Sequence, residues 1–313
     1  MIDTSILDLL DQRLGSGRAR RRLAIEEWAL IKSARQRVKF LHRRSWYAHP
    51  HVIATVLWCA GLYARGRRNN ADVVVRKNTV HSPSLPAAFD GFKILHLSDL
   101  HVDENEAALQ RAITLIGECD YDICVLTGDY RGDVSNTSDA ALRGMSALAA
   151  RVKAPALAVL GNHDPIEIVS GLESTGIRVL LNECEPVLRG RERIFIAGID
   201  DQHFFRTGDI AKAAAQIPRG EFAILLSHTP ETFQQAEQAG FQLMLSGHTH
   251  GGQICLPGSI PITLDARLPR QFGAGPWRYG TMQGYTSVGV GTIIAPVRLN
   301  CPPEITIHEL RRR

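Results

Sequence analysis

Five short segments of this chain concentrate aspartate, asparagine and histidine, the side chains that commonly bind divalent metal ions. In chain order they are Asp99-Leu100-His101, Gly128-Asp129, Gly161-Asn162-His163-Asp164, His228 and Gly247-His248-Thr249-His250. Mixed carboxylate, imidazole and amide donors suit borderline ions such as Mn²⁺, Fe²⁺ or Zn²⁺. Two such ions about 4 Å apart can activate a shared hydroxide and neutralise phosphoryl oxygens. The residue types therefore predict a hydrolytic site with two metal ions.

Each of these segments follows an apolar run that indicates a buried strand. The first three follow FKILHLS, YDICVLT and PALAVL, while His228 follows FAILLS and Gly247 follows FQLMLS. Open α/β sheets hold their sites at the carboxyl ends of the strands. We therefore expect the five strand ends to bring these side chains together.

The elements between the strands predict the fold class. Residues 102–118 place Leu109, Ile113 and Ile116 on one helical face, and residues 138–152 read as another helix. This alternation indicates βαβ units, whereas the later, denser strands indicate a second, mixed sheet. The predicted fold is α/β, a four-layer α-β-β-α sandwich of two mixed sheets, with a helical basic amino-terminal appendage.

Residues 1–70 differ from the rest of the chain in charge. They hold 14 Lys and Arg against 5 Asp and Glu, whereas the remainder holds 22 against 27. Apolar residues recur at helical spacing from Leu23 to Leu41 with basic residues between them, which predicts an amphipathic helix. We predict a basic helical, membrane-associating appendage over residues 1–70 and a domain over residues 71–313 that carries the site.

An apolar run at residues 52–64 lies between Arg43-Arg44 and a second group of arginines at positions 65, 67 and 68. The run is shorter than the ~20 residues that a membrane-spanning helix needs. Its basic flanks and aromatic residues suit a helix lying on, or dipping into, an anionic membrane. The alternatives are a helical hairpin packed on the catalytic domain, and a true span by residues 46–64. Binding of nucleic acid is disfavoured because no stacking platform accompanies the arginines.

In their order, the five motifs resemble those of the calcineurin-like metallophosphoesterases, over about residues 90–310. The resemblance implies a metallophosphoesterase domain with two metal ions, of which Mn²⁺ is expected and Fe²⁺, Zn²⁺ or Mg²⁺ are alternatives. One ion would be held by Asp99, His101, Asp129 and His250. The other would be held by Asp129, Asn162, His228 and His248, so that Asp129 bridges the two.

His163 resembles the catalytic histidine of this family, which is not a metal ligand. The resemblance implies that His163 stabilises the transition state or protonates the leaving oxygen, and that Asp164 orients it. Two other histidines, His96 within a strand and His308 near the carboxyl terminus, are interpreted as satisfied core residues. The sequence identifies no substrate-binding residue; we expect the substrate to be chosen by the basic appendage and by the loops around Arg131 and Arg298.

Three longer stretches are similar to a bacterial membrane-associated phosphodiesterase branch that includes relatives of UDP-diacylglucosamine hydrolases. They are LPAAFDGFKILHLSDLH, GHTHGGQICLP and GVGTIIAPVRLNCPPEITIHEL. The resemblance implies hydrolysis of a phosphodiester or pyrophosphate bond in a lipid-linked substrate, such as UDP-diacylglucosamine in lipid A synthesis. The expected location is the cytoplasmic side of the inner membrane, peripheral or shallowly inserted, or otherwise the cytoplasm.

Two alternative functions follow from the same residues. One keeps the chemistry but acts on nucleotides, cyclic nucleotides or general phosphodiesters. The other is a non-catalytic scaffold, which the complete set of ligands disfavours. Nucleic acid is not an expected partner because the part after residue 70 is net acidic. The six cysteines form no C-x-x-C pair, which indicates a reducing compartment, and the first twenty residues show no cleavable signal peptide. The oligomeric state is not predicted.

Overall fold

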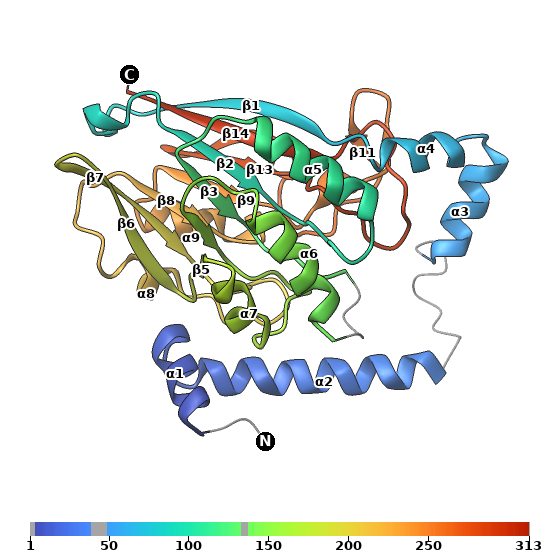
Figure 1. Cartoon of the computed structure of the whole chain (residues 1–313), viewed down its shortest axis with the longest axis horizontal. Helices are drawn as coiled ribbons and strands as arrows, with labels where there is room; N and C mark the ends of the chain where they lie inside the picture. Colours follow the sequence, from blue (N-terminus) through green and yellow to red (C-terminus); the bar gives the residue numbers. More distant parts are fainter. Residues whose placement is uncertain (1–3, 39–48, 133–136, 313) are drawn as a thin grey trace.

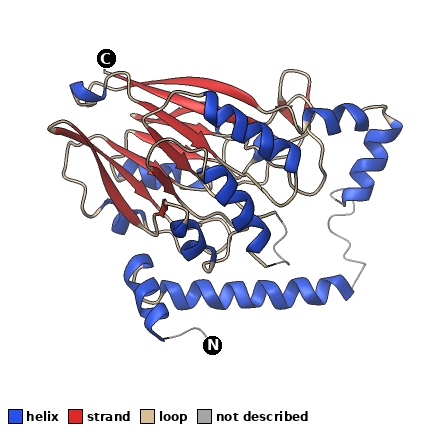
Figure 2. Cartoon of the chain, in the orientation of Figure 1, coloured by secondary structure: helices blue, strands red, loops and turns tan. Residues whose placement is uncertain are grey.

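The computed structural model describes residues 4–38, 49–132 and 137–312. Two six-stranded sheets lie face to face with helices on their outer sides (Figure 1, Figure 2). The first sheet has the order β1 (Val74–His81), β14 (Glu304–Arg311), β2 (Lys93–Leu97), β3 (Ile123–Leu126), β4 (Ala156–Ala158) and β5 (Ile177–Val179). The second has the order β12 (Gly275–Tyr279), β13 (Met282–Thr286), β9 (Leu243–Ser246), β8 (Ala223–Leu226), β7 (Glu192–Gly198) and β6 (Glu183–Arg189).

Both sheets are mixed, with parallel strands at their centres. In the first sheet β2, β3, β4 and β5 are parallel, and β14 pairs antiparallel with β2. In the second sheet β7, β8, β9 and β13 are parallel, and β6 and β12 are antiparallel edge strands. Every residue of β3, β4, β8 and β9 is buried, which explains their continuous apolar sequences. The five predicted metal-binding motifs follow β2, β3, β4, β8 and β9, which are all among these parallel strands.

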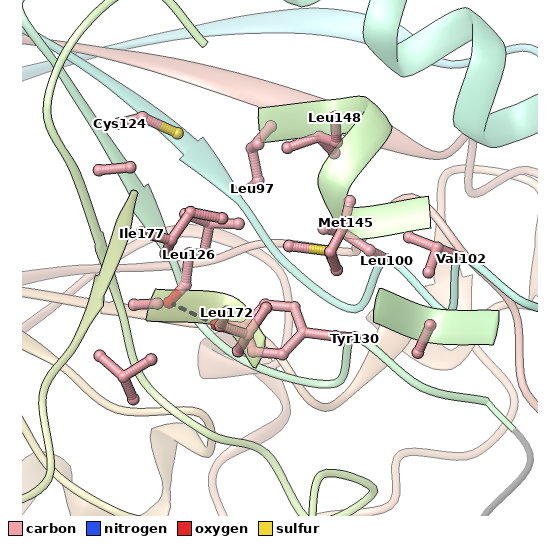
Figure 3. Close-up of a cluster of buried hydrophobic side chains, with 14 of the residues drawn as sticks. Leu97, Leu100, Val102, Cys124, Leu126, Tyr130, Met145, Leu148, Leu172 and Ile177 are labelled. Atoms are coloured by element: carbon pink, nitrogen blue, oxygen red, sulfur yellow. Dashed lines mark hydrogen bonds between the residues drawn. The ribbon is translucent and has the colours of Figure 1, made fainter. Parts of the chain in front are cut away.

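The helices complete four layers. The outer face of the first sheet is covered by α5 (Glu106–Glu118), α6 (Asp139–Ala149) and α7 (Ile168–Ser174). The outer face of the second is covered by α8 (Ile210–Ala214) and α9 (Phe233–Gln238). Met145 and Leu148 of α6 pack with Leu97 and Leu126 of the sheet (Figure 3). The predicted α/β sandwich of two mixed sheets is confirmed.

The amino-terminal region begins with α1 (Thr4–Leu14) and α2 (Arg18–Val38), and α2 runs along the outside of the molecule (Figure 1). The predicted amphipathic helix corresponds to α2, although Leu41 lies outside the described residues. Leu10, Leu14 and Ala19 join the same apolar cluster as the outer face of the first sheet. The domain boundary near residue 70 stays a prediction, and these contacts show that α1 and the start of α2 pack on residues beyond it.

The apolar run at residues 52–64 is divided between α3 (Pro50–Cys59) and α4 (Tyr63–Asn69), with Gly61 at a positive φ of 69° between them. Within the part of the chain that the structure describes, no helix combines the length and apolarity needed to cross a membrane. The remaining short elements are β10 (Cys255–Leu256), β11 (Ile260–Pro261) and the 3-10 helices η2 (Ala87–Phe89), η3 (Pro230–Thr232), η4 (His250–Gly252) and η5 (Arg270–Phe272).

Candidate metal centre

All seven predicted ligands lie just beyond the carboxyl ends of central strands. They are Asp99 and His101 after β2, Asp129 after β3, Asn162 after β4, His228 after β8, and His248 and His250 after β9. Positive φ angles occur at Asp99 (47°), His101 (39°), Asp129 (56°), His248 (72°) and His250 (49°). Such angles store about 1–3 kcal/mol of strain each in residues other than glycine. The surrounding structure therefore bends the backbone to aim these side chains.

The first predicted ligand group is assembled. Donor atoms of Asp99, His101, Asp129 and His250 all lie within 4.8 Å of one another, and all four residues are buried. The Nε2 atoms of His101 and His250 face each other at 3.3 Å. Nε2 of His250 lies 3.5 Å from Oδ1 of Asp99, and Nε2 of His101 lies 3.8 Å from Oδ2 of Asp129.

The second predicted group is assembled around the same aspartate. Nε2 of His228 lies 3.3 Å from Oδ2 of Asp129, 3.0 Å from Oδ1 of Asn162 and 3.2 Å from Nδ1 of His248. Asp129 thus belongs to both groups, the position that the predicted bridging ligand requires.

The hydrogen bonds of the histidines suit metal binding. Nδ1 of His101 lies 2.9 Å from the carbonyl oxygen of Arg131, and Nδ1 of His228 lies 2.7 Å from that of Thr127. These carbonyls accept the Nδ1 protons, so each Nε2 atom is directed into the cluster, where it could bind a metal ion. Among the described residues, the buried Nε2 of His248 has no hydrogen-bond partner. The donor set is therefore one that could hold divalent ions.

Burial and charge set the protonation of these ligands. Burial lowers the pKa of His101 to about 4 and that of His248 to about 3, so both imidazoles are neutral at pH 7. Burial also disfavours the cation of His228, but the nearby carboxylates, Asp129 foremost and then Asp99 and Asp201, together outweigh burial and raise the pKa of His228 to about 10. Burial raises the pKa of Asp99 to about 6. Without metal, the site therefore holds a proton on His228 beside the carboxylate of Asp129. A metal ion bound there would displace this proton.

Two glycines of the motifs, Gly161 and Gly247, lie so close to predicted ligands that no larger residue would fit. A Cβ atom on Gly161 would lie 2.1 Å from Oδ1 of Asp129, and one on Gly247 would lie 2.2 Å from Oδ2 of Asp99. Real Cβ atoms are not found at such distances, so only glycine lets these two loops approach the ligands.

His163 lies beside the first ligand group, with its ring centroid 5.1 Å from that of His101. Its backbone N–H donates to Oδ1 of Asp129 (2.9 Å), and its Nδ1 lies 3.0 Å from the carbonyl oxygen of Gly132. The buried carboxylate of Asp164 accepts the backbone N–H groups of Asp129 (2.8 Å), Tyr130 (2.9 Å) and Gly161 (2.9 Å). Among the described residues, no hydrogen bond joins this carboxylate to the His163 ring, so its orienting role stays a prediction. Asp164 thus fixes the loops that carry Asp129 and His163.

His96 and His308 are buried core residues, as predicted, but they also begin a hydrogen-bond chain to the site. His308 Nε2 lies 3.2 Å from His96 Nδ1, and His96 Nε2 lies 2.9 Å from Thr127 Oγ1. Thr127 donates to Ser98 (2.6 Å), and Ser98 donates to Oδ2 of Asp99 (2.6 Å). This hydrogen-bond chain leaves no signal in the sequence, because only the pairing of β14 with β2 brings His308 next to His96.

Arg131 and Arg298, in the two loops expected to choose the substrate, are both buried. The guanidinium of Arg298 is fully buried and donates to the carbonyl oxygens of Val288 (2.7 Å) and Gly291 (2.6 Å). Nε of Arg131 donates to the carbonyl oxygen of His163 (3.1 Å). Arg298 thus holds a loop of the protein instead of facing a substrate.

One further histidine lies at the edge of the cluster and was missed by the sequence analysis. The His203 ring centroid is 4.2 Å from that of His248, and its Nδ1 lies 2.9 Å from a carboxylate oxygen of Glu231. This hydrogen bond to Glu231 raises the pKa of His203. The segment around His203 carries no motif that could have predicted this position.

Two packed mixed sheets whose central strand ends gather carboxylate, amide and imidazole donors define a metal-dependent phosphoester hydrolase. Residues 92–252 match the calcineurin-like phosphoesterase family, and the chain belongs to that family. The predicted family and enzyme class are therefore confirmed.

Two bacterial proteins are similar in sequence to this chain over most of its length. The metallophosphoesterase YkuE of Bacillus subtilis (strain 168) is 30% identical over 271 residues, which cover 83% of this chain and 93% of that protein. Phosphodiesterase YaeI of Escherichia coli (strain K12) is 33% identical over 232 residues, covering 70% and 82%. Among solved structures, the NAD nucleotidase of Haemophilus influenzae is 16% identical with a TM-score of 0.42, over 64% of this chain and 45% of that one.

Proposed function

We propose that this protein hydrolyses a phosphodiester or pyrophosphate bond of a lipid-linked substrate at an anionic membrane surface. The observation that carries the proposal is a set of exposed apolar side chains on three segments that contact one another, here called the apolar face. Its residues are Val56, Trp58, Leu62, Leu256, Ile260, Ile262 and Ile294.

Helix α3 contributes to the apolar face because only one of its sides is packed. Leu57 is buried in a cluster with Ala295, Val297 and Leu299. On the other side the exposed fraction is 60% for Val56 and 74% for Trp58. Exposed apolar side chains gathered in one region mark an interaction site, and tryptophan is favoured where a membrane meets water.

The arginines of α4 suit an anionic surface. Arg65, Arg67 and Arg68 are exposed and directly follow the apolar part of α3. A basic residue near an anionic bilayer contributes about 1 kcal/mol to binding. The combination of apolar and basic side chains favours a lipid surface over a neutral partner.

The apolar face is joined directly to the metal centre. The hairpin of β10 and β11 follows the turn that carries His248 and His250, and the thiol of Cys255 donates to the carbonyl oxygen of Gly251 (3.2 Å). Arg65 of α4 donates to Oδ1 of Asn300, which itself donates to the carbonyl oxygen of Cys255 (2.8 Å). We propose that a lipid held against this face presents its head group to the site.

The chain's own residues supply positioning and proton transfer. Asp99, His101, Asp129 and His250 would hold one divalent ion, and Asp129, Asn162, His228 and His248 the other, with Mn²⁺ the proposed ion. When bound, the two ions activate water and neutralise the phosphoryl oxygens. The Nδ1–H of His163 is held by the carbonyl oxygen of Gly132, so Nε2 is the nitrogen left for the substrate, and the imidazolium form would give its Nε2 proton to the leaving oxygen and become neutral. Asp164 holds the loop in place for this step.

A nucleotide-lipid such as UDP-diacylglucosamine combines a pyrophosphate with acyl chains, and we propose this substrate class on the cytoplasmic side of the inner membrane. The alternative is a general phosphodiesterase acting on nucleotides or cyclic nucleotides. The similarity of this chain to phosphodiesterase YaeI favours this alternative as much as the first.

Vesicle binding tests the apolar face. The purified protein is mixed with vesicles of phosphatidylglycerol and phosphatidylcholine, or of phosphatidylcholine alone, and the bound fraction is measured by flotation. We expect binding only to the anionic vesicles, and about a 10-fold weaker affinity after Trp58→Ser, since an aromatic side chain contributes about 1.5–3 kcal/mol when buried. Leu188→Ser is the matched control, because Leu188 is 71% exposed on β6, outside the apolar face. Equal losses for both variants, or no binding, would refute the membrane role.

A substrate panel separates the two candidate functions. The Mn²⁺-loaded protein is assayed on UDP-diacylglucosamine in vesicles, a cyclic nucleotide and an aryl phosphodiester. We expect Trp58→Ser to lower turnover of the lipid substrate and to leave the two soluble substrates unchanged. Efficient hydrolysis of cyclic nucleotides with indifference to the lipid would establish the alternative.

A further inference from the structure

Arg22 is among the largest fully buried side chains in the structure, although it lies in a strongly basic helix on the outside of the molecule. Its relative exposure is 0%. Taking a guanidinium out of water carries a desolvation penalty of several kcal/mol, which only good geometry and full hydrogen bonding offset. The position therefore requires specific partners.

The partners of Arg22 come from three parts of the chain. Nε donates to Oε1 of Glu26 (2.8 Å), and Nη1 donates to Oδ1 of the buried Asp200 (2.7 Å). Nη2 donates to the backbone carbonyl oxygen of Asp164 (2.5 Å). The guanidinium also stacks on the Phe205 ring, 3.5 Å from its centroid. All three nitrogens are thus bonded, two of them to residues far along the chain.

Apart from Glu26, which belongs to α2 itself, the partners of Arg22 lie in loops next to the metal centre. Asp164 follows His163 directly, and its carboxylate holds the loop of Asp129. Oε1 of Glu26 accepts the backbone N–H of Ile166 (2.8 Å), so the helix holds the chain both at residue 164 and at residue 166. Asp200 and Phe205 lie on either side of His203, whose ring contacts that of His248.

We propose that Arg22 and Glu26 are positioning residues for the reaction, which act through Asp164 on the loop that carries His163. Helix α2 is then a part of the catalytic unit, and its docking sets the rate of turnover. The inference rests on the catalytic role proposed for His163.

The other charged contacts of the amino-terminal region provide a control. Arg18 of the same helix donates to Oδ2 of Asp209 (2.6 Å), and both side chains are partly exposed. This pair holds α2 to the domain but does not touch the loop of residues 161–166. Arg18→Gln therefore loses an ion pair of the same helix without the connection to His163.

Kinetics of Arg22→Lys, Arg22→Gln and Arg18→Gln test the proposal in the full-length, Mn²⁺-loaded protein. Lysine keeps the charge but cannot bond Asp200 and the Asp164 carbonyl together. We expect Arg22→Lys to retain most of the thermal stability yet to lower kcat by about 10- to 100-fold, with KM within about 3-fold, since residues that orient a catalytic group have effects of this size. Arg18→Gln should leave kcat within about 2-fold. Equal kcat losses for Arg18→Gln and Arg22→Gln would overturn the proposal.

A double-mutant cycle identifies the route of the effect. If Arg22 acts through His163, Arg22→Gln should lower kcat in the wild-type background but not in the His163→Ala background. The loss should also be larger for an alkyl than for an aryl leaving group, because the alkoxide depends more on protonation. Full additivity of the two substitutions would contradict the proposed route.

Amide hydrogen exchange of the metal-free protein provides a readout that is independent of activity. We expect Arg22→Gln to speed exchange in residues 161–166 at least several-fold, while Arg18→Gln leaves it unchanged. Unchanged exchange in that loop would overturn the inference whatever the activity. A wild-type protein that hydrolyses no phosphoester would instead refute the proposed function, and the exchange result would still decide whether α2 holds the loop.

Discussion

The metal centre and the amino-terminal region gather charged side chains in different ways. At the centre, the topology of two sheets brings strand ends together, so that motifs of a few residues determine the site. In the amino-terminal region, single arginines reach partners that are distant in the sequence, such as Arg22 and Asp164, which are 142 positions apart. Helices α1 and α2 are held by such charge pairs, whereas α3 exposes apolar side chains. A high positive charge over residues 1–70 therefore combines arginines that dock the chain on itself with arginines that remain exposed.

The largest effect is expected at the residue shared by the two ligand groups. Asp129→Asn removes the carboxylate that both groups use, so we expect kcat to fall by more than about 1000-fold and the bound metal to fall below two ions per chain. Metal content by elemental analysis and turnover of an aryl phosphodiester measure this. Two bound ions with nearly normal turnover would show that Asp129 does not bridge, and Asp120→Asn, an exposed carboxylate that pairs with Lys93, is the control.

A smaller loss is expected from the hydrogen-bond chain behind the centre. Ser98→Ala removes the donor that orients Oδ2 of Asp99, and we expect the Mn²⁺ concentration for half-maximal activity to rise about 10-fold, with kcat changed less. Ser84→Ala, which removes a surface hydroxyl paired with Ser82, is the matched control. An unchanged Mn²⁺ requirement in Ser98→Ala would mean that the hydrogen-bond chain from His308 to Asp99 does not influence metal binding.

The two histidines of this hydrogen-bond chain, His96 and His308, should make the folded protein less stable in acid. Burial lowers the pKa of His96 to about 3, and burial also lowers the pKa of His308. Below pH ~6.5 the unfolded chain takes up a proton at each position while the folded protein does not, so stability is full above that pH and is lost as the pH falls from 6.5 towards 3. We expect about 1 kcal/mol of lost unfolding free energy per histidine at pH 5.5.

Urea unfolding at pH 7.5 and 5.5 measures this effect, with His96→Gln beside the wild type. The variant should lose about 1 kcal/mol less on acidification, because one proton-binding site is absent from its unfolded state. An identical pH dependence in both proteins would show that His96 is not held neutral.

The smallest effect sharpens the contrast between Arg22 and the other arginines that dock α1 and α2. Arg13 donates to the carbonyl oxygen of Val179 (2.6 Å) and pairs with Glu173 and Glu183, which are partly exposed. We expect Arg13→Gln to lower the unfolding free energy by about 1 kcal/mol and to leave kcat within about 2-fold. Thermal unfolding and steady-state kinetics on the same preparation measure both. A large loss of kcat would mean that any disturbance of α1 and α2 reaches the site, which would weaken the specific role of Arg22.

The strand-end ligands could be predicted because both their type and their place follow from local sequence. A short, continuous apolar run identifies each strand, and a sheet brings the carboxyl ends of its parallel strands together. The role of Asp164 could not be predicted, since its partners are backbone N–H groups whose directions depend on the positive φ of Asp129. The partners of Arg22 were equally hidden, because a basic residue on a basic helix predicts solvent exposure unless the opposite surface is known. The division of residues 52–64 at Gly61 was missed for a simpler reason: the apolar run continues through the turn.

The central claim is that the five strand ends form one centre that needs two divalent ions for hydrolysis. A titration of Mn²⁺ into metal-free protein tests this most directly, with turnover of an aryl phosphodiester followed at each addition. Turnover should be absent without metal, reach its maximum at two ions per chain, and stay near the baseline at every addition in Asp129→Asn. Full turnover of the metal-free protein, or a maximum at one ion per chain, would contradict the account.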